Sequence, residues 1–311
     1  IAVLSRSLGA ELRTADFNAK NVRVFSGPYT LSDYRFGEFV EMRRNPHWQG
    51  QAPAFEVANF KIISSDASRM AALLSGDVQA VDEVSVPDIA RLRRDANLNV
   101  TQIAGMRVMY IAMDTERDVS PFVRDAAGQP MTRNPLKDAR VRQALSLALN
   151  RQAIVERVME GAATVASNLL PTGTPGTSEA LRVATQDLER ARRLLAEAGY
   201  PNGFQITIHA TNDRYPNDEK VAQAIAQFWT RIGVRTEVTT MPNAAYFPAA
   251  ARQTFSVMAA QYGADNVSYA YRALVHTFDR ERGLGTANRT RHSSPRADAI
   301  VARALIEMDE A

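Results

Sequence analysis

The chain has 311 residues, of which 45% are hydrophobic and 23% charged, and its formal net charge is +3. This composition is typical of a globular protein of about two domains and excludes an intrinsically disordered chain. The sequence contains no cysteine, which excludes disulfides, thiolate metal sites and cysteine nucleophiles. No apolar run reaches the length of a transmembrane helix, about 18 residues, so we expect no direct membrane insertion.

The first part of the chain mixes short strands with short helices. Alternating apolar residues predict strands over residues 38–45, 55–63, 98–103 and 107–114. Helical spacing predicts helices over residues 65–76, with Ser65 as N-cap, and over residues 86–95. Residues 115–138 follow, and this polar stretch with three prolines is typical of a linker.

The second part of the chain alternates helical and strand patterns more regularly. Helices are predicted over residues 138–161, 187–199, 218–233, 244–252 and 268–278, and strands over 204–210, 234–240 and 255–261. Asn150 is placed as the N-cap of a second helix within residues 138–161, and Gly161 ends that helix. A last helix begins with Ser294 as N-cap, and its apolar pattern continues to the end of the chain. Strands that alternate with helices predict an α/β fold.

Arginines gather towards the end of the chain, at Arg280, Arg282, Arg289, Arg291 and Arg296. Such clusters are found in nucleic-acid-binding proteins, but Asp279 and Glu281 interrupt this one and no aromatic residues are spaced through it for base stacking. We therefore interpret the cluster as a solvated loop and expect no nucleic-acid partner.

The motifs of common enzymes are missing from the sequence. It has no nucleophile elbow, no phosphate-binding loop and no dinucleotide fingerprint. The four histidines, His47, His209, His276 and His292, form no metal-binding spacing, and His209 is placed on the polar face of a strand. We therefore expect a binding protein with no cofactor, no metal site and no catalytic residue.

Polar side chains follow two predicted strands at the points where those strands end. They are Asn212, Asp213, Arg214 and Tyr215 after the strand over 204–210, and Tyr262 and Asp265 after the strand over 255–261. If the two strands run parallel, these residues lie at the same edge of the sheet, where ligands bind in open α/β folds. Arg214 and Asp265 would then meet a carboxylate and an ammonium group. Alternatively, Asp265 caps the helix over 268–278 and Arg214 is solvated; spacing alone does not decide between these interpretations.

Four stretches resemble a known family in both sequence and order. They are "SGPYTLSDYRFGEFVEMRRNPHWQG" (26–50), "VRQALSLALNRQAIVERVMEGAATVASNLLP" (141–171), "DLERARRLLAEAGYPNGF" (187–204) and "WTRIGVRTEV" (229–238). Together they resemble family 5 of the bacterial solute-binding proteins, the dipeptide- and oligopeptide-binding subunits of ABC importers. The resemblance runs from about residue 26 to residue 311. It implies a two-lobe α/β fold of the periplasmic-binding-protein type II, peptide-binding cluster.

The resemblance also implies which part of a family member this chain is. Residues 1–130 would form part of the first lobe, and residues 131–311 the second lobe with a wall of the ligand cleft. We expect the chain to be an internal piece of a longer protein, incomplete at both ends and without its signal segment.

The resemblance implies roles for the residues at the strand ends. The family's W-x-x-D motif has Tyr262 in place of its Trp but keeps its acid, Asp265, which would receive the α-ammonium group of a peptide. The loop with Arg214 resembles one that contributes an arginine to ligand carboxylates. Tyr262 offers an apolar face with a polar tip, and Tyr215 and Asn212 complete the candidate ligand-binding set.

The expected function is therefore transport rather than catalysis. The protein would capture a peptide-like solute in the periplasm, or anchored by lipid outside the cytoplasmic membrane, and deliver it as a monomer to ABC permease subunits. Two alternatives stay open: a carboxylate-dependent hydrolase, and a protein of the same fold that binds a sugar, an opine or a metal chelate.

Overall fold

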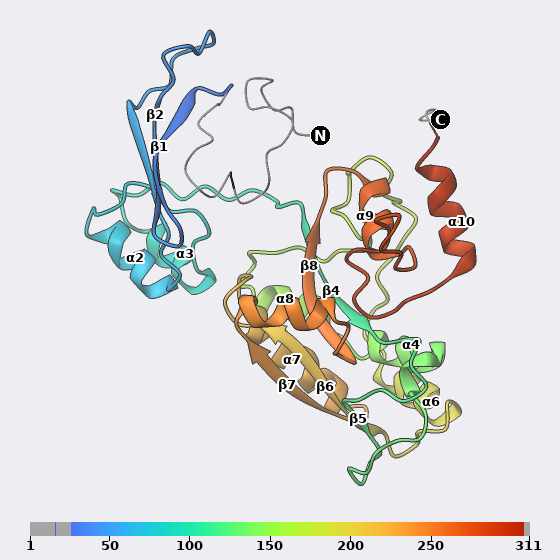
Figure 1. The fold of residues 1–311 in the computed structure, drawn as a ribbon. Helices are drawn as coiled ribbons and strands as arrows, with labels where there is room; N and C mark the ends of the chain where they lie inside the picture. Colours follow the sequence, from blue (N-terminus) through green and yellow to red (C-terminus); the bar gives the residue numbers. More distant parts are fainter. Residues whose placement is uncertain (1–15, 17–25, 308–311) are drawn as a thin grey trace. The chain divides into compact units, whose positions relative to one another are not determined.

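The computed structural model describes Asp16 and residues 26–307, which fall into two compact units divided between Val84 and Ser85. The first unit contains an antiparallel sheet of order β1-β2-β3 followed by one helix (Figure 1). Its elements are β1 (Tyr29–Arg35), β2 (Phe39–Arg44), β3 (Val57–Lys61) and α2 (Asp66–Leu74). Ser65 caps α2 as predicted, because its side chain accepts a hydrogen bond from the Ser68 N–H.

The strand β1 was not predicted from the sequence. The register of β1 against β2 shifts between Leu31 and Asp33, which marks a β-bulge. A bulge inserts one extra residue and so breaks the period-two alternation by which a strand is recognised in sequence.

The second unit is built on a five-stranded mixed sheet with β6 at its centre. Its strands are β4 (Arg107–Met113), β5 (Val123–Arg124), β6 (Phe204–Thr211), β7 (Val234–Met241) and β8 (Val257–Gly263). β7 and β8 both run parallel to β6, whereas β4 pairs antiparallel with β8 and β5 pairs antiparallel with the first half of β6. The predicted strands over 107–114, 204–210, 234–240 and 255–261 are confirmed.

Helices connect these strands and follow them along the chain. They are η2 (Val86–Asp88), α3 (Ile89–Leu92), η3 (Pro135–Lys137), α4 (Ala139–Leu147), α5 (Arg151–Arg157), α6 (Leu188–Glu197), α7 (Asp218–Thr230), α8 (Asn243–Ala251), α9 (Val267–Leu274) and α10 (Pro295–Ala304). The break predicted at Asn150 is confirmed, since its side chain accepts a hydrogen bond of 2.9 Å from the Ala153 N–H at the start of α5. α10 begins after Ser294 as predicted, but it ends at Ala304 rather than continuing through Leu305 and beyond. The last residues of the predicted helix, 308–311, lie outside the described residues.

The sheet of the second unit has hydrophobic cores on both faces. Alternate residues of a strand point to opposite faces. Accordingly Ile206 and Val257 belong to a large core with α4, α6 and α7, in which the indole N–H of Trp229 donates to the Leu145 carbonyl. Met258 belongs to a second core, formed with Tyr246 of α8. The sheet is therefore buried on both sides, as the predicted α/β class requires.

Two predictions for the first half of the chain are wrong. Residues 98–103 form no strand, and no neighbouring strand among the described residues pairs with them. Residues 115–138 are not a free linker, because they contain β5 and bury Val123 and Leu136 in the core of the second unit.

The compact units divide at a different place from the predicted lobes, which meet at residues 130 and 131. The reason is that β4 and β5 hydrogen-bond into the sheet of the second unit. Residues 85–130 therefore belong to the same compact unit as the residues that follow them.

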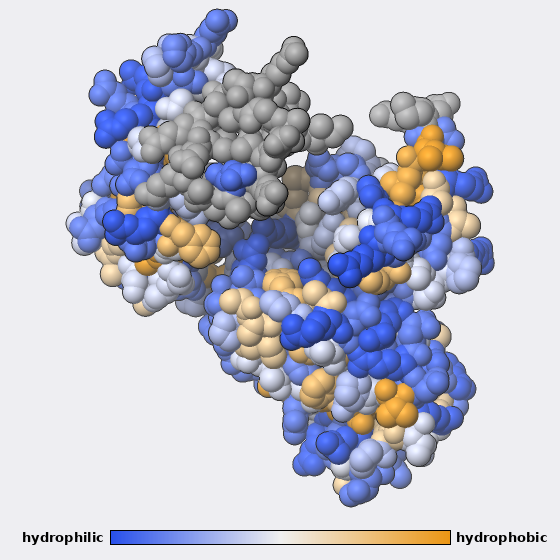
Figure 2. Space-filling model, in the orientation of Figure 1, coloured by the Kyte–Doolittle hydropathy of each residue, from blue (hydrophilic) through white to orange (hydrophobic). Residues whose placement is uncertain are grey.

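Exposed apolar side chains are scattered over a mainly hydrophilic surface (Figure 2). Ile300 of α10 and Ile306, just after this helix, are 56% and 78% exposed, and Figure 2 shows an orange patch near the C-terminal end of the helix. Within the part of the chain that the structure describes, no helix is long and apolar enough to cross a membrane.

Candidate ligand-binding site

The two strands that precede the candidate residues run parallel, which is the arrangement on which their prediction depended. Ile208 of β6 lies opposite Val257 of β8, and His209 lies opposite Met258. The carboxyl ends of both strands therefore meet at one edge of the sheet (Figure 1).

A hydrogen bond joins the loop after β6 to the end of β8. The Tyr215 hydroxyl donates to the backbone carbonyl of Gln261 at 3.3 Å, next to Tyr262. The structure thus brings Tyr215 and Tyr262 to the same place, although 47 positions separate them in the chain. Neither residue could have been placed there by its local sequence alone.

The buried carboxylate of Asp218 fixes the shape of this loop. Its Oδ2 accepts hydrogen bonds from the Thr211 hydroxyl at 2.6 Å and from the backbone N–H groups of Arg214 at 3.3 Å and Tyr215 at 3.2 Å. Asp218 is only 6% exposed, so these donors offset the cost of burying its charge. The side chains of Arg214 and Tyr215 consequently start from a defined backbone.

The other polar residues of the loop differ in what they do. Asp213 accepts a 2.7 Å hydrogen bond from the Asn243 N–H and so holds the loop against the start of α8. Asn212 is exposed. Arg214 is half-buried, with its guanidinium carbon 5.4 Å from the centre of the Tyr215 ring, and it makes no salt bridge to any residue of the described ranges.

Asp265 does not cap the helix that follows it. The N-cap of α9 is Asn266, whose side chain accepts a hydrogen bond of 2.8 Å from the Tyr269 N–H. The alternative role considered for Asp265 is therefore wrong. Its carboxylate is exposed and accepts one hydrogen bond of 3.0 Å from the Asn266 side chain, and in residues 26–307 it forms no salt bridge.

An aromatic surface surrounds the end of β8. Tyr262 is half-buried, and burial raises its pKa above the ordinary tyrosine value. Tyr110 of β4 lies opposite Ala260, one strand away from the loop with Tyr215. Burial raises the pKa of Tyr110 to about 12, and both Tyr215 and Tyr262 add to this rise, so Tyr110 is a neighbour of both.

The sequence prediction missed Tyr110 and one more residue near it, Arg289. The Arg289 guanidinium opposes the rise in the Tyr110 pKa, which places this cation beside the same surface. The arginine-rich stretch was interpreted as a solvated loop, and for Arg289 that interpretation is wrong, since the Nε atom is buried. Tyr110 lies inside a predicted strand rather than at its end, so the pattern of polar residues at strand ends does not include it.

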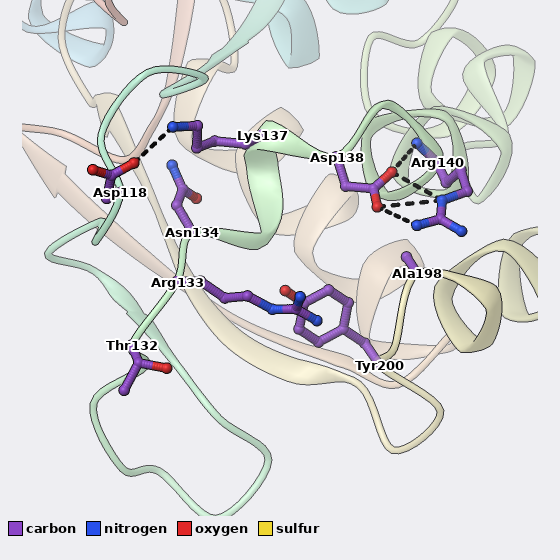
Figure 3. Close-up of a pocket in the computed structure, with 9 residues that line it drawn as sticks. All are labelled: Asp118, Thr132, Arg133, Asn134, Lys137, Asp138, Arg140, Ala198 and Tyr200. Carbon is purple, nitrogen blue, oxygen red and sulfur yellow. Dashed lines mark hydrogen bonds and ion pairs between the residues drawn. The ribbon is translucent and has the colours of Figure 1, made fainter.

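A separate pocket of about 280 Å³ lies beside the start of β6, at the other end of that strand (Figure 3). It is lined by Asp118, Thr132, Arg133, Asn134, Lys137, Asp138, Arg140, Ala198 and Tyr200. Two of its three cations are paired, Lys137 with Asp118 and Arg140 with Asp138, while Arg133 lies over the ring of Tyr200. None of the predicted site residues lines this pocket.

Metal-binding residues do not gather anywhere in the described ranges. No group of three or more His, Asp or Glu side chains there is arranged to hold a metal ion. His209 is buried rather than solvated, with its ring stacked on Phe255 at 4.2 Å.

The sequence matches one family model and a set of curated proteins. The model "Bacterial extracellular solute-binding proteins, family 5 Middle" matches residues 9–280. "Heme-binding protein A" of Haemophilus influenzae is 31% identical over 230 residues, covering 72% of this chain and 38% of that protein. "Dipeptide-binding protein" of Escherichia coli is 28% identical over 218 residues, covering 69% of this chain and 38% of that protein. The chain thus spans about two fifths of the length of these relatives.

Solved structures show the same fold. A dipeptide-binding protein from Pseudoalteromonas sp. SM9913, in complex with Met-Leu, superposes with a TM-score of 0.76 and 21% identity, covering 98% of this chain and 58% of that one. The periplasmic binding protein DppA from Helicobacter pylori, in complex with the peptide STSA, superposes with a TM-score of 0.73 and 22% identity, covering 91% and 52%. The predicted periplasmic-binding-protein fold is confirmed.

Proposed function

The chain belongs to family 5 of the bacterial extracellular solute-binding proteins, and from this membership we propose that it captures a peptide-like solute for an ABC importer. Relatives of similar identity carry the names dipeptide-binding, di/tripeptide-binding and glutathione-binding protein, and one is named heme-binding protein. The chain would supply the binding step, and the permease subunits would move the solute across the membrane.

The observation that carries the peptide assignment is a pair of opposite charges at one edge of the sheet. Asp265 and Arg214 follow two parallel strands, and each lacks an oppositely charged partner among the residues described. A peptide carries an ammonium and a carboxylate group, and both need partners when the ligand is enclosed and loses water. Each charge-assisted hydrogen bond would contribute roughly 1.5–3 kcal/mol net.

The aromatic residues beside these charges would hold the middle of the ligand. Tyr262 and Tyr215 each present an apolar ring with a polar tip, which suits a peptide backbone. Asn212, exposed in the same loop, would add a donor and an acceptor. Bridging water in such a site tolerates different side chains, so we propose loose selectivity for the side chains of the ligand.

The setting of this binding step follows from the family. We propose that residues 1–130 contribute to a first lobe and that residues 131–311, together with β4 and β5, form the second, with the ligand enclosed between lobes by a hinge motion. The protein would act as a monomer in the periplasm, or anchored by lipid outside the cytoplasmic membrane.

The assignment is tested by weighing the bound solute and by removing one charge. Native mass spectrometry of the protein purified without refolding should release a peptide with a free amine. Asp265→Asn should weaken binding of that peptide by about tenfold or more in calorimetry, because one charge-assisted contact is lost. Glu281→Gln removes an exposed carboxylate elsewhere in the same unit and should leave the affinity unchanged.

Other outcomes would overturn parts of the proposal. Unchanged affinity in the Asp265→Asn protein would remove this residue from the site. A released sugar, opine or metal chelate would keep the transport function but end the peptide assignment. Turnover of the released solute would favour the alternative of a hydrolase.

A further inference from the structure

Arg289 has a buried side-chain donor that its surroundings leave without an acceptor. Its Nε atom is buried and makes no hydrogen bond within residues 26–307, and its guanidinium carbon lies 4.6 Å from the centre of the Phe247 ring. A guanidinium is permanently charged and carries five N–H donors, so a buried and unused donor costs free energy. A cost of this kind is expected where a ligand supplies the missing acceptor.

The backbone that carries Arg289 is fixed on both sides. Asn288 is 4% exposed, and its side chain donates to the carbonyls of His276 at 3.0 Å and His292 at 2.6 Å. Asn288 also accepts a hydrogen bond of 3.0 Å from the His292 N–H, and Thr290 is 5% exposed. Arg289 thus stands between two buried residues and is held in place before any ligand arrives.

The position of Arg289 links it to the candidate ligand-binding site. Its neighbour Phe247 and Tyr110 pack against the same small core, on the face of the sheet that carries Met258 and Ala260. Tyr262 follows Ala260 by two positions on β8 and therefore points to that face. The aromatic surface beside Arg289 accordingly extends to the candidate site.

We propose that Arg289 binds the carboxylate group of the ligand. This inference rests on the proposed function and deepens it: Asp265 keeps the ammonium group, whereas the carboxylate is assigned to Arg289, outside the two strand-end loops, in place of Arg214. A carboxylate matches the planar fork of a guanidinium and would satisfy the unpaired Nε donor of Arg289. Tyr110 stays protonated at neutral pH, since its pKa is about 12, and keeps a neutral hydroxyl donor beside the cation.

Arg214 is the competing candidate for the same group. It is half-buried over Tyr215, a residue of its own loop, and the structure leaves none of its side-chain nitrogen atoms buried without a partner. Arg289 has already lost part of its contact with water and gained no acceptor in return. The gain from a bound carboxylate is therefore larger at Arg289 than at Arg214.

The experiment compares ligands that differ only at the carboxylate. A library of dipeptides with free C-termini and the same library with amidated C-termini are offered separately, and bound members are identified by native mass spectrometry and titrated by calorimetry. The parent protein should prefer the free acids by about tenfold or more. Arg289→Gln should abolish this preference, and Arg289→Lys should keep part of it because the charge remains. Arg291→Gln, an exposed arginine of the same segment, should leave it unchanged.

The possible outcomes separate this inference from the proposed function. If Arg289→Gln keeps the preference and Arg214→Gln loses it, the inference is wrong while the peptide assignment stands. If the parent protein binds neither library, the peptide assignment fails and this inference fails with it. An unchanged circular dichroism spectrum of the Arg289→Gln protein ensures that its lost preference reports on the contact and not on unfolding.

Discussion

At the scale of single residues, His209 makes the stability of the protein depend on pH. Its side chain is 3% exposed, stacked on Phe255 at 4.2 Å and packed edge-on against Phe122 at 4.5 Å. Burial lowers its pKa from 6.5 to about 4, so the folded protein keeps this ring neutral in mildly acidic solution. The unfolded chain binds a proton there more readily, and protonation therefore favours unfolding.

The contribution of His209 is fully present above pH 6.5 and is lost as the pH falls towards 4. We expect a total loss of about 3 kcal/mol in the free energy of unfolding across this window. Urea denaturation at a series of pH values measures it. His209→Gln should flatten the slope between pH 6.5 and 4, whereas His47→Gln, at an exposed histidine, should preserve it. An identical slope in the His209→Gln protein would contradict this account.

A second prediction at the scale of single residues concerns Asp218. In Asp218→Asn an amide nitrogen replaces one carboxylate oxygen and accepts no hydrogen bond, so the Thr211 hydroxyl and the N–H groups of Arg214 and Tyr215 lose their acceptor when it takes the place of Oδ2. The free energy of unfolding should fall by about 1–3 kcal/mol. Ligand affinity should fall with it, because the loop of the candidate site loosens. Glu219→Gln on the same helix is the matched control, and a loss as large in this variant would argue against a specific role for Asp218.

At the scale of elements, helix starts were predictable and strand pairing was not. Asn150 and Ser294 cap the helices after them through their own side chains, a signal that lies within a few residues. Residues 98–103 alternate like a strand, but a strand also needs a neighbour to accept its hydrogen bonds. Val123 enters the sheet because it lies opposite Ile206, a partner far along the chain that no local pattern reveals.

The cap at Asn150 gives a direct test of this distinction. Asn150→Ala should destabilise the protein by about 1 kcal/mol, because the Ala153 N–H loses its acceptor. Asn150→Asp keeps a capping oxygen and should change the stability little. Urea denaturation compares the two with Gln152→Ala, an exposed position of the same helix. Equal losses in the free energy of unfolding for Asn150→Ala and Asn150→Asp would show that the capping hydrogen bond does not contribute to stability.

Two glycines meet where β6 and β7 begin. Gly203 has a φ of +70°, and a Cβ there would lie 1.8 Å from the carbonyl oxygen of Gly233. Gly233 has a φ of +91°, but its Cβ would be 3.7 Å from the nearest atom of Gly203. Gly203→Ala should therefore cost about 3 kcal/mol or more, from a clash with backbone that does not yield.

Gly233→Ala is the matched comparison and should cost about 1 kcal/mol, from backbone strain alone. Thermal unfolding of both variants measures the difference. A milder effect at Gly203 than at Gly233 would mean that the two backbone segments separate easily at this point and would contradict the predicted clash.

At the scale of the whole molecule, the sequence predicts only the part of the candidate site that depends on the direction of the strands. Parallel strands place their following loops at one edge, so the order of strands predicts that Tyr215 and Tyr262 lie near each other, and the hydrogen bond from Tyr215 to the Gln261 carbonyl agrees with this. That either residue binds a ligand stays a prediction.

The sequence does not predict a role for Arg289, because the burial of its Nε atom depends on tertiary contacts. The Asn288 side chain makes these contacts by hydrogen-bonding to the carbonyls of His276 and His292. The residues next to Arg289 in sequence are charged or polar and predict a solvated loop, and the tertiary contacts show that this prediction is wrong for Arg289.

The distribution of buried residues predicts that the second unit folds without the first. Of the hydrophobic side chains buried in residues 26–307, Met70 is the only one before Ser85, whereas the second unit has cores on both faces of its sheet. Burial of apolar surface is the dominant stabilising contribution, so residues 85–311 should fold without the first unit and unfold cooperatively.

Tryptophan fluorescence tests this prediction. The chain has two tryptophans, Trp48 and Trp229, and only Trp229 remains in residues 85–311. Trp229 is fully buried and donates to the Leu145 carbonyl, so its fluorescence should be blue-shifted and should report a single sigmoidal transition in urea. A red-shifted spectrum, or a gradual change without a transition, would mean that residues before Ser85 are needed to assemble this core.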